Sequence, residues 1–90
     1  MNKAEFISAI AEAAGSSKSD ATAQVEAMIN VVTNTLKGDD QVTIVGFGTL
    51  LAKKREARTG RNPRTGESIQ IKASTVPAFK AGKAFKDALN

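Results

Sequence analysis

One stretch of the chain concentrates residues whose type and spacing could do chemistry, and that chemistry is the binding of anions. Residues 53–72 contain seven lysines and arginines but only two acids. Such a density of positive charge favours contact with nucleic-acid phosphates, which supply affinity and salt dependence but little sequence readout. The alternative is that these charges only keep an exposed strand soluble and unpaired. We name these seven residues the arm cations, after the two-stranded arm predicted for residues 53–75. They are Lys53, Lys54, Arg55, Arg58, Arg61, Arg64 and Lys72.

The residues that are missing narrow the function further. The 90 residues include no cysteine and no histidine, which removes disulfides, thiol nucleophiles, imidazole bases and the usual zinc ligands. We therefore expect no enzymatic activity, no cofactor and no metal. Asp39 and Asp40 form a carboxylate pair, but they follow Gly38, and we expect a solvated turn there rather than a metal site.

The charge is divided unequally along the chain. Residues 1–40 carry three cations and six anions, a net charge of −3, whereas residues 41–90 carry ten cations and three anions, a net charge of +7. The second half therefore favours a polyanionic partner. An anionic membrane surface is the competing partner, but this half lacks the amphipathic helix that would favour it. Apolar runs are short and the opening residues resemble no secretory signal, so we expect neither a membrane span nor export.

Two helices are predicted in the first 40 residues. Asn2 and Glu5 have the spacing of a capping box for a helix over residues 3–14, which Gly15 ends. Phe6 shares the apolar face of this helix. The other members of that face are Ile7, Ile10, Ala11 and Ala14.

The second predicted helix begins after Ser17, with Asp20 as its capping partner, and continues to Leu36 or Lys37. Residues 38–40 form its exit turn. Its apolar stripe is too wide for one short helix to cover. The members of this stripe are Ala21, Val25, Met28, Ile29, Val31, Val32 and Leu36.

After residue 40 the pattern changes to the alternation typical of strands. The predicted fold is therefore α+β, in the order α-α-β-β-β-α, with residues 1–90 as one domain divided into a helical part, 1–40, and a second part, 41–90. The predicted elements of this second part are a strand at 41–45, a tight connection at 46–48, a strand from Leu50 through the basic run, a turn region at 59–66, a returning strand at 68–74, a segment at 76–79 leading back to the core, and a short helix from Gly82 to Asn90.

Residues 53–75 contain few large apolar side chains apart from Ile69 and Ile71. We expect them to form a long two-stranded arm, since ten extended residues span roughly 33 Å. A lone ribbon is marginally stable in water, so the arm should be mobile until it meets a partner. The remaining residues are too few to form a stable core by themselves. Without cysteine or histidine, neither disulfides nor the usual metal ligands can add stability, so oligomerisation is the remaining source. We predict a homodimer or a heterodimer with a close relative.

Four motifs in one register resemble the HU/IHF family of bacterial histone-like, DNA-bending proteins, and HU more than IHF. They are Gly46-Phe47-Gly48-Thr49-Leu50, Arg55 with Arg58, Gly60-Arg61-Asn62-Pro63-Arg64-Thr65-Gly66, and Val76-Pro77-Ala78-Phe79-Lys80. The resemblance covers all 90 residues. It implies an intertwined dimer with a three-stranded antiparallel sheet whose ribbon arms embrace DNA. Leu50 and Ala81 depart from the pattern, where phenylalanine and proline are expected.

Pro63 supports two compatible interpretations. The run Asn62-Pro63-Arg64-Thr65-Gly66 is a good turn by itself. The resemblance further implies that each tip proline wedges between base pairs and kinks the duplex. Proteins of the HU and IHF type are known for apolar wedges of this kind.

Lys3, Lys18 and Lys83 each stand at the start of a predicted helix, where a cation opposes the helix dipole. One interpretation is that these exposed lysines have no functional role. The other is that each helix start binds a phosphate through its free backbone N–H groups and the lysine ammonium. The resemblance favours phosphate contacts on the flanks of the body. Lys37, Lys80 and Lys86 are ambiguous by themselves. The expected DNA-binding set adds Asn62, Pro63, Lys80 and Lys86 to the arm cations and to the three helix-start lysines.

Strand alternation would place Lys53, Arg55 and Arg61 on one face of the arm and Lys54 and Arg58 on the other, unless an inserted residue reverses it. Phe6, Phe47, Phe79 and Phe85 could stack on bases, but apolar neighbours and the absence of Trp and Tyr favour core packing and argue against a single-strand binder.

The sequence thus predicts a non-enzymatic architectural protein of the bacterial nucleoid. It would bind duplex DNA with little sequence preference, bend and compact it, and favour bent, nicked or gapped forms. RNA remains a possible further partner. Two alternatives stay open: an IHF-like, sequence-preferring subunit, and a structural dimerisation domain that meets another polyanionic surface.

Overall fold

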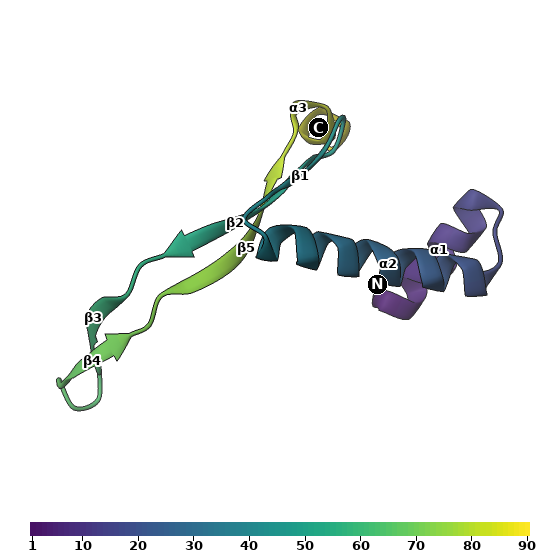
Figure 1. Cartoon of the computed structure of the whole chain (residues 1–90). Coiled ribbons are helices and arrows are strands. Elements are labelled where there is room, and N and C mark those ends of the chain that lie inside the picture. The colour runs from purple at the N-terminus through teal and green to yellow at the C-terminus, as the bar shows by residue number, and fades with distance from the viewer. The chain divides into compact units, whose positions relative to one another are not determined.

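The computed structural model describes residues 1–90, which divide into two compact units. Residues 1–34 form the helical unit and residues 35–90 form the sheet unit. In chain order the elements are α1 (Lys3–Ala14), α2 (Lys18–Lys37), β1 (Val42–Ile44), β2 (Gly48–Arg55), β3 (Arg58–Arg61), β4 (Ser68–Ile71), β5 (Ser74–Ala81) and α3 (Lys83–Ala88) (Figure 1).

Capping fixes both ends of α1 as predicted. The Asn2 side chain accepts a hydrogen bond from the backbone N–H of Glu5 at 2.9 Å, and the Glu5 side chain accepts from the backbone N–H of Asn2, which completes the capping box. Gly15 then adopts the left-handed conformation, with φ of 65°, and its N–H bonds back to the last turn. Each of these bonds satisfies a terminal group that the helix itself leaves unpaired.

The helical unit has a small core of its own. Ile7 and Ala11 of α1 pack with Ala21 and Val25 of α2, and Ile10 lies against this cluster. Phe6 was predicted to share this buried face, but it is 46% exposed. Two small alanines at the contact leave room for close helix approach but little apolar area to bury.

The start of α2 is capped by Ser17, whose hydroxyl accepts from the N–H of Asp20 at 3.0 Å. The helix ends at Lys37, and the predicted exit turn follows. Asp39 has a φ of 60°, the one positive value outside glycine. The wide apolar stripe of α2 stays largely uncovered, because Met28, Ile29 and Val31 are all exposed.

The sheet unit contains a three-stranded antiparallel sheet in the order β1-β2-β5 and a separate two-stranded ladder of β3 and β4. β2 and β5 pair along all eight residues, from Gly48 opposite Ala81 to Arg55 opposite Ser74. Figure 1 shows β3 and β4 continuing the β2–β5 ribbon outward. The predicted sheet with its extended arm is confirmed.

An aromatic cluster lies at the other end of this sheet. The ring centroid of Phe47 lies 5.0 Å from that of Phe79 and 4.9 Å from that of Phe85 in α3. Core packing was predicted for these rings, and they do pack on one another, yet Phe47 and Phe79 remain 40% and 43% exposed. Gly48 is needed beside them, because a Cβ there would lie 2.5 Å from the carbonyl oxygen of Lys80 and 2.8 Å from the Phe79 ring.

Several predicted boundaries were wrong. The turn region at 59–66 is narrower, since residues 59–61 belong to β3. The returning strand at 68–74 is broken after Ile71, and the segment at 76–79 is part of a full strand, β5. The first strand is confined to Val42–Ile44, and Val45 stands in the following turn. Local propensity is a weak guide here because pairing with the opposite strand decides which residues extend.

The two departures from the family pattern leave the strands intact. Leu50 lies between Val42 and Phe79 in the sheet, and Ala81 is the last residue of β5, opposite Gly48. Gly82 is the N-cap of α3, which runs from Lys83 to Ala88 and is shorter at both ends than the predicted helix from Gly82 to Asn90. The N–H of Gly82 donates to the carbonyl oxygen of Phe47 at 2.8 Å. None of the helices combines the length and apolar character that a membrane crossing requires.

Candidate nucleic-acid interface

The arm is a ribbon whose two ladders are interrupted at matched positions. The first ladder ends at the pair Arg55 and Ser74, and the second begins at the pair Arg58 and Ile71. Two residues on each strand, 56–57 and 72–73, separate the ladders, so pairing resumes without an inserted residue. The insertion that would have reversed the predicted alternation is therefore absent, although the full face assignment stays a prediction.

One face of the outer ladder is apolar. Gly60 lies opposite Ile69, and a Cβ on Gly60 would meet the Ile71 side chain at 2.8 Å. Ile69 and Ile71 therefore pack over a strand that has no side chain at this point. This small apolar strip stabilises the ladder, and the alternation of a strand places Arg58 on the same face and Arg61 on the opposite one.

Asn62 organises the tip of the arm. Its backbone N–H donates to Glu67 at 2.8 Å, its carbonyl oxygen accepts from the N–H of Gly66 at 2.7 Å, and its side-chain oxygen accepts from the N–H of Arg64 at 2.9 Å. These bonds fix the turn that presents Pro63, which is exposed. Asn62 itself is half-buried, so its observed contacts support the tip rather than reach outward.

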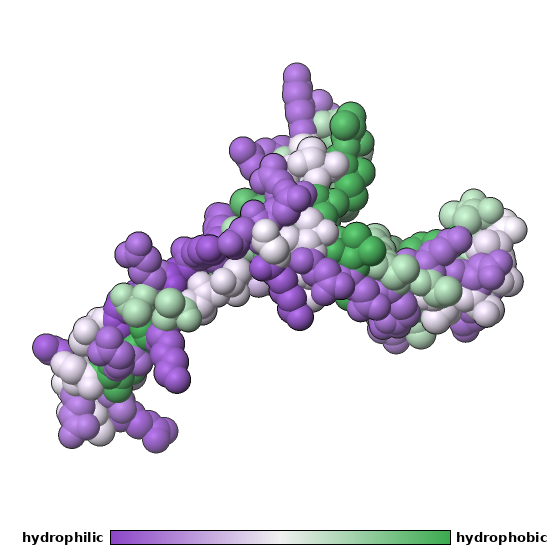
Figure 2. Space-filling model, viewed as in Figure 1, coloured by the Kyte–Doolittle hydropathy of each residue, from purple (hydrophilic) through white to green (hydrophobic).

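All seven arm cations are exposed, and six of them have no carboxylate within ion-pair distance. Figure 2 shows many hydrophilic residues along the arm in this view, with near-neutral and some apolar residues among them. Unpaired, solvated guanidinium and ammonium groups on a ribbon form a strongly positive surface. The six are Lys53, Arg55, Arg58, Arg61, Arg64 and Lys72.

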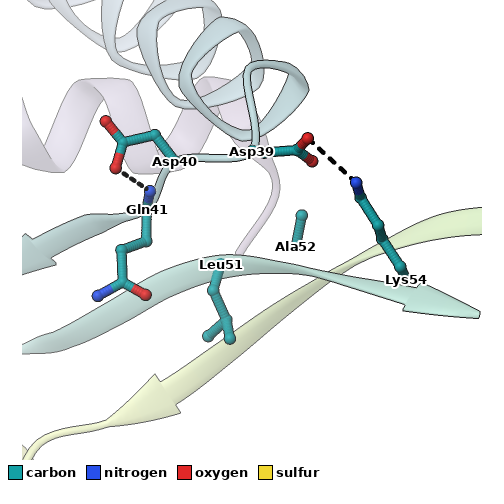
Figure 3. A pocket seen from close by; sticks show the side chains of 6 residues that line it. All are labelled: Asp39, Asp40, Gln41, Leu51, Ala52 and Lys54. Carbon is teal, nitrogen blue, oxygen red and sulfur yellow. Dashed lines mark hydrogen bonds and ion pairs between the residues drawn. The ribbon is translucent and has the colours of Figure 1, made fainter.

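Lys54 is the exception among the arm cations. Its ammonium Nζ lies 3.0 Å from Oδ2 of Asp39, in the turn after α2. Figure 3 shows this pair beside a shallow hollow of about 540 Å³, whose other lining residues are Asp40, Gln41, Leu51 and Ala52. The sequence did not reveal this pairing, because residues 15 positions apart carry no periodic signal.

The three helix-start lysines are the first residues of their helices, as predicted. However, the N–H groups of Glu5 and Asp20 already donate to the caps Asn2 and Ser17, so fewer amides remain free for an anion than an uncapped helix would offer. Lys3 also forms an ion pair with Glu26 of α2. Lys18 and Lys83 have no such partner.

Two further candidate lysines lie on the sheet unit. Lys80 stands on β5 opposite Thr49, and both side chains share the face away from Phe79, because Phe79 pairs with the neighbouring residue Leu50. Thr43 lies beside Thr49 on this face, with their hydroxyl oxygens 3.3 Å apart. Lys86 lies in the last turn of α3 and is exposed.

The structure contains no cluster of three potential metal ligands. In the exit turn of α2, Asp39 pairs with Lys54, and Asp40 accepts from the N–H of Gln41 at 2.8 Å. Their carboxylates thus have protein partners, which fits the expected turn.

Three comparisons place this geometry among known proteins. The family model described as bacterial DNA-binding protein matches residues 1–90. The chain is 53% identical over 89 residues to the DNA-binding protein HU of Geobacillus stearothermophilus, covering 99% of each chain, and 54% identical over 90 residues to the DNA-binding protein HU-beta of Pseudomonas aeruginosa, covering 100% of each. It is also similar to the HU chain in an Anabaena HU–DNA cocrystal structure, with a TM-score of 0.89, 43% identity, and coverage of 99% of this chain and 97% of that one.

Proposed function

This chain belongs to the bacterial DNA-binding protein family, its relatives there are HU proteins, and we propose that it acts as an architectural, HU-like protein. In this role it binds duplex DNA with little sequence preference, bends it and compacts it. Residues 1–90 act as one functional domain, with the nucleoid of a bacterial cell as its place of action. The protein needs no catalytic group for this work, since its relatives are DNA-binding proteins and not enzymes.

The observation that carries the proposal is the cationic arm. Six arm cations are exposed to solvent without acidic partners, on a ribbon of two paired strands. Such groups neutralise phosphates and release counterions, which gives binding that is strong at low salt and largely blind to sequence. A solubilising role alone would not require the acids to be so scarce along the same ribbon.

The second element of the proposal is a dimer. No large side chain is fully buried in the chain, while Met28, Ile29 and Val31 of α2 and the rings of Phe47 and Phe79 are exposed to solvent. Apolar area of this extent is typical of a surface that another chain covers. A second copy, or a close paralogue, would cover α2 and the aromatic cluster and would supply the second arm.

In the proposed mechanism each arm enters the minor groove and Pro63 holds a kink between base pairs. The fixed tip turn presents the proline ring at the end of the ribbon, and apolar wedges of this kind bend DNA toward the major groove. Lys3, Lys18, Lys80, Lys83 and Lys86 then contact phosphates on the flanks. Bent, nicked or gapped DNA should bind better because less deformation energy remains to be supplied.

The test is fluorescence anisotropy with a random-sequence duplex, a nicked twin and a set of scrambled duplexes across a salt series. We expect similar affinities for all intact duplexes, about tenfold tighter binding to the nicked form, and a log–log salt slope of about 0.9 for every phosphate contacted. A duplex RNA of the same length serves as a further arm.

Each alternative has its own outcome in this experiment. Discrimination of several kcal/mol among the scrambled duplexes would replace the proposal with a sequence-preferring, IHF-like function. A stable dimer that binds no DNA at moderate salt would instead support a dimerisation domain for another polyanionic surface.

A further inference from the structure

The single ion pair of the arm lies at its base. Lys54 of β2 and Asp39 in the exit turn of α2 are joined at 3.0 Å, and both belong to the sheet unit (Figure 3). The other arm cations have no such partner. The carboxylate of Asp39 therefore pairs with Lys54 and with no other arm cation.

The backbone holds Asp39 in place for this contact. Its φ of 60° is uncommon for a residue with a side chain, although Asp and Asn tolerate it better than others. The N–H of Asp39 donates to Leu36 and that of Asp40 donates to Thr35, each at 3.2 Å. The turn therefore fixes the position from which the carboxylate reaches β2.

From this geometry we infer that Asp39 is a positioning residue for DNA binding. It holds the Lys54 ammonium against the exit turn and so withholds one arm cation from the phosphates. The inference rests on the proposed function, which it deepens by assigning a residue that limits affinity. No spacing or motif would have shown this role, because only the fold brings the two side chains together.

The pair is weak enough to modulate binding without blocking it. The side chains of Lys54 and Asp39 are 68% and 62% exposed, and ion pairs at this exposure contribute little to stability. A phosphate can therefore compete for Lys54. The expected effect of Asp39 is a moderate loss of affinity at low salt rather than an on–off switch.

The chain offers a matched control in the neighbouring carboxylate. Asp39→Asn and Asp40→Asn each remove one negative charge from the same turn, but only Asp39 contacts Lys54. Asparagine suits the left-handed backbone at 39, and at 40 its side-chain oxygen still accepts from Gln41. Both variants should therefore fold as the original chain does.

Anisotropy titrations of a random-sequence duplex with the full-length protein measure the difference. We expect Asp39→Asn to tighten binding about two- to fivefold more than Asp40→Asn does and to steepen the salt slope by up to about 0.9 for each chain. In a Lys54→Gln background the two asparagine variants should bind alike. A role in folding alone would alter thermal unfolding but would leave the salt slope unchanged.

The outcomes separate this inference from its premise. Equal effects of the two asparagine variants on Kd and salt slope, or a difference that survives Lys54→Gln, would overturn the role of Asp39 while leaving the proposed function intact. An original chain that binds no duplex at all would overturn the proposed function and, with it, this inference.

Discussion

In the helical unit, Ile7, Ala11, Ala21 and Val25 are each less than a tenth exposed, whereas in the sheet unit the rings of Phe47 and Phe79 keep about two fifths of their surface in solvent. Both the helical core and the aromatic cluster are made of apolar side chains that their helices and strands bring together. They differ because two helices can close around small side chains, while a three-stranded sheet with one short helix cannot surround three rings. The aromatic cluster thus stays partly exposed in a single chain, as do Met28, Ile29 and Val31 of α2.

The same two units differ in charge. Residues 1–34 carry four acids and two lysines, whereas the arm has two acids against seven cations. Lys3 is paired with Glu26 in the helical unit, whereas most arm cations have no partner. In the proposed function, association depends mainly on the apolar surface and DNA binding mainly on the arm, and each proposal can be tested separately.

The largest expected effect concerns the aromatic cluster. Phe79→Ala should lower the free energy of unfolding of the proposed dimer by about 3 kcal/mol per chain, because it removes a ring that packs on Phe47 and Phe85. Urea unfolding and sedimentation at several protein concentrations measure the loss and the accompanying shift toward monomer.

Leu89→Ala is the control for this experiment, since Leu89 is 73% exposed near the end of α3. Its effect should stay within about 0.5 kcal/mol. If the Phe79→Ala variant is as stable and as dimeric as the original chain, the aromatic cluster does not contribute to the proposed association.

The second effect compares arm and helix-start cations at equal charge. Replacing Arg58, Arg61 and Arg64 together by glutamine should weaken duplex binding by about tenfold or more at 0.1 M salt and lower the salt slope by about 0.9 for each phosphate that is no longer neutralised. Replacing Lys3, Lys18 and Lys83 by glutamine should cost less, because Lys3 is already paired and two of the helix starts are capped. Anisotropy across a salt series compares them, and equal losses of affinity would contradict the arm's leading role.

The smallest change in affinity is expected at the arm tip. Pro63→Ala should alter Kd by less than about threefold, because the bonds made by Asn62 hold the turn without the proline ring, but it should reduce bending, since alanine is a poorer wedge. Energy transfer between dyes at the two duplex ends measures the bend.

The other proline provides the control. Pro77 lies in β5 opposite Ala52, away from the tip, and Pro77→Ala should leave the bend angle unchanged. If the Pro63→Ala variant bends DNA as fully as the original chain, the proposal that Pro63 acts as a wedge is wrong, whereas the proposal of DNA binding is unaffected.

Local signals predicted the helices well and the strands less well. Asn2, Glu5, Gly15 and Ser17 set the helix ends through bonds within a few residues, so their spacing was sufficient. The break in the ribbon at residues 56–57 and 72–73 depends on pairing between strands, which no local pattern encodes. Phe6 was misplaced for a similar reason, because its burial depends on what lies across the helix rather than on the helix itself.

By itself, the sequence determined that two helices precede the strands and a short helix follows them, although it predicted three strands where the structure has five. It also determined the charge asymmetry, the turn-forming tip and the family to which the chain belongs. These follow from side-chain type and short-range spacing, which act within a few residues. Only the tertiary structure decided that six arm cations are unpaired while Lys54 meets Asp39, and that Phe47, Phe79 and Phe85 form a cluster that stays partly exposed. Contacts between distant residues depend on how the strands and turns meet in space, and that arrangement decides which charges and which apolar surfaces remain available to a partner.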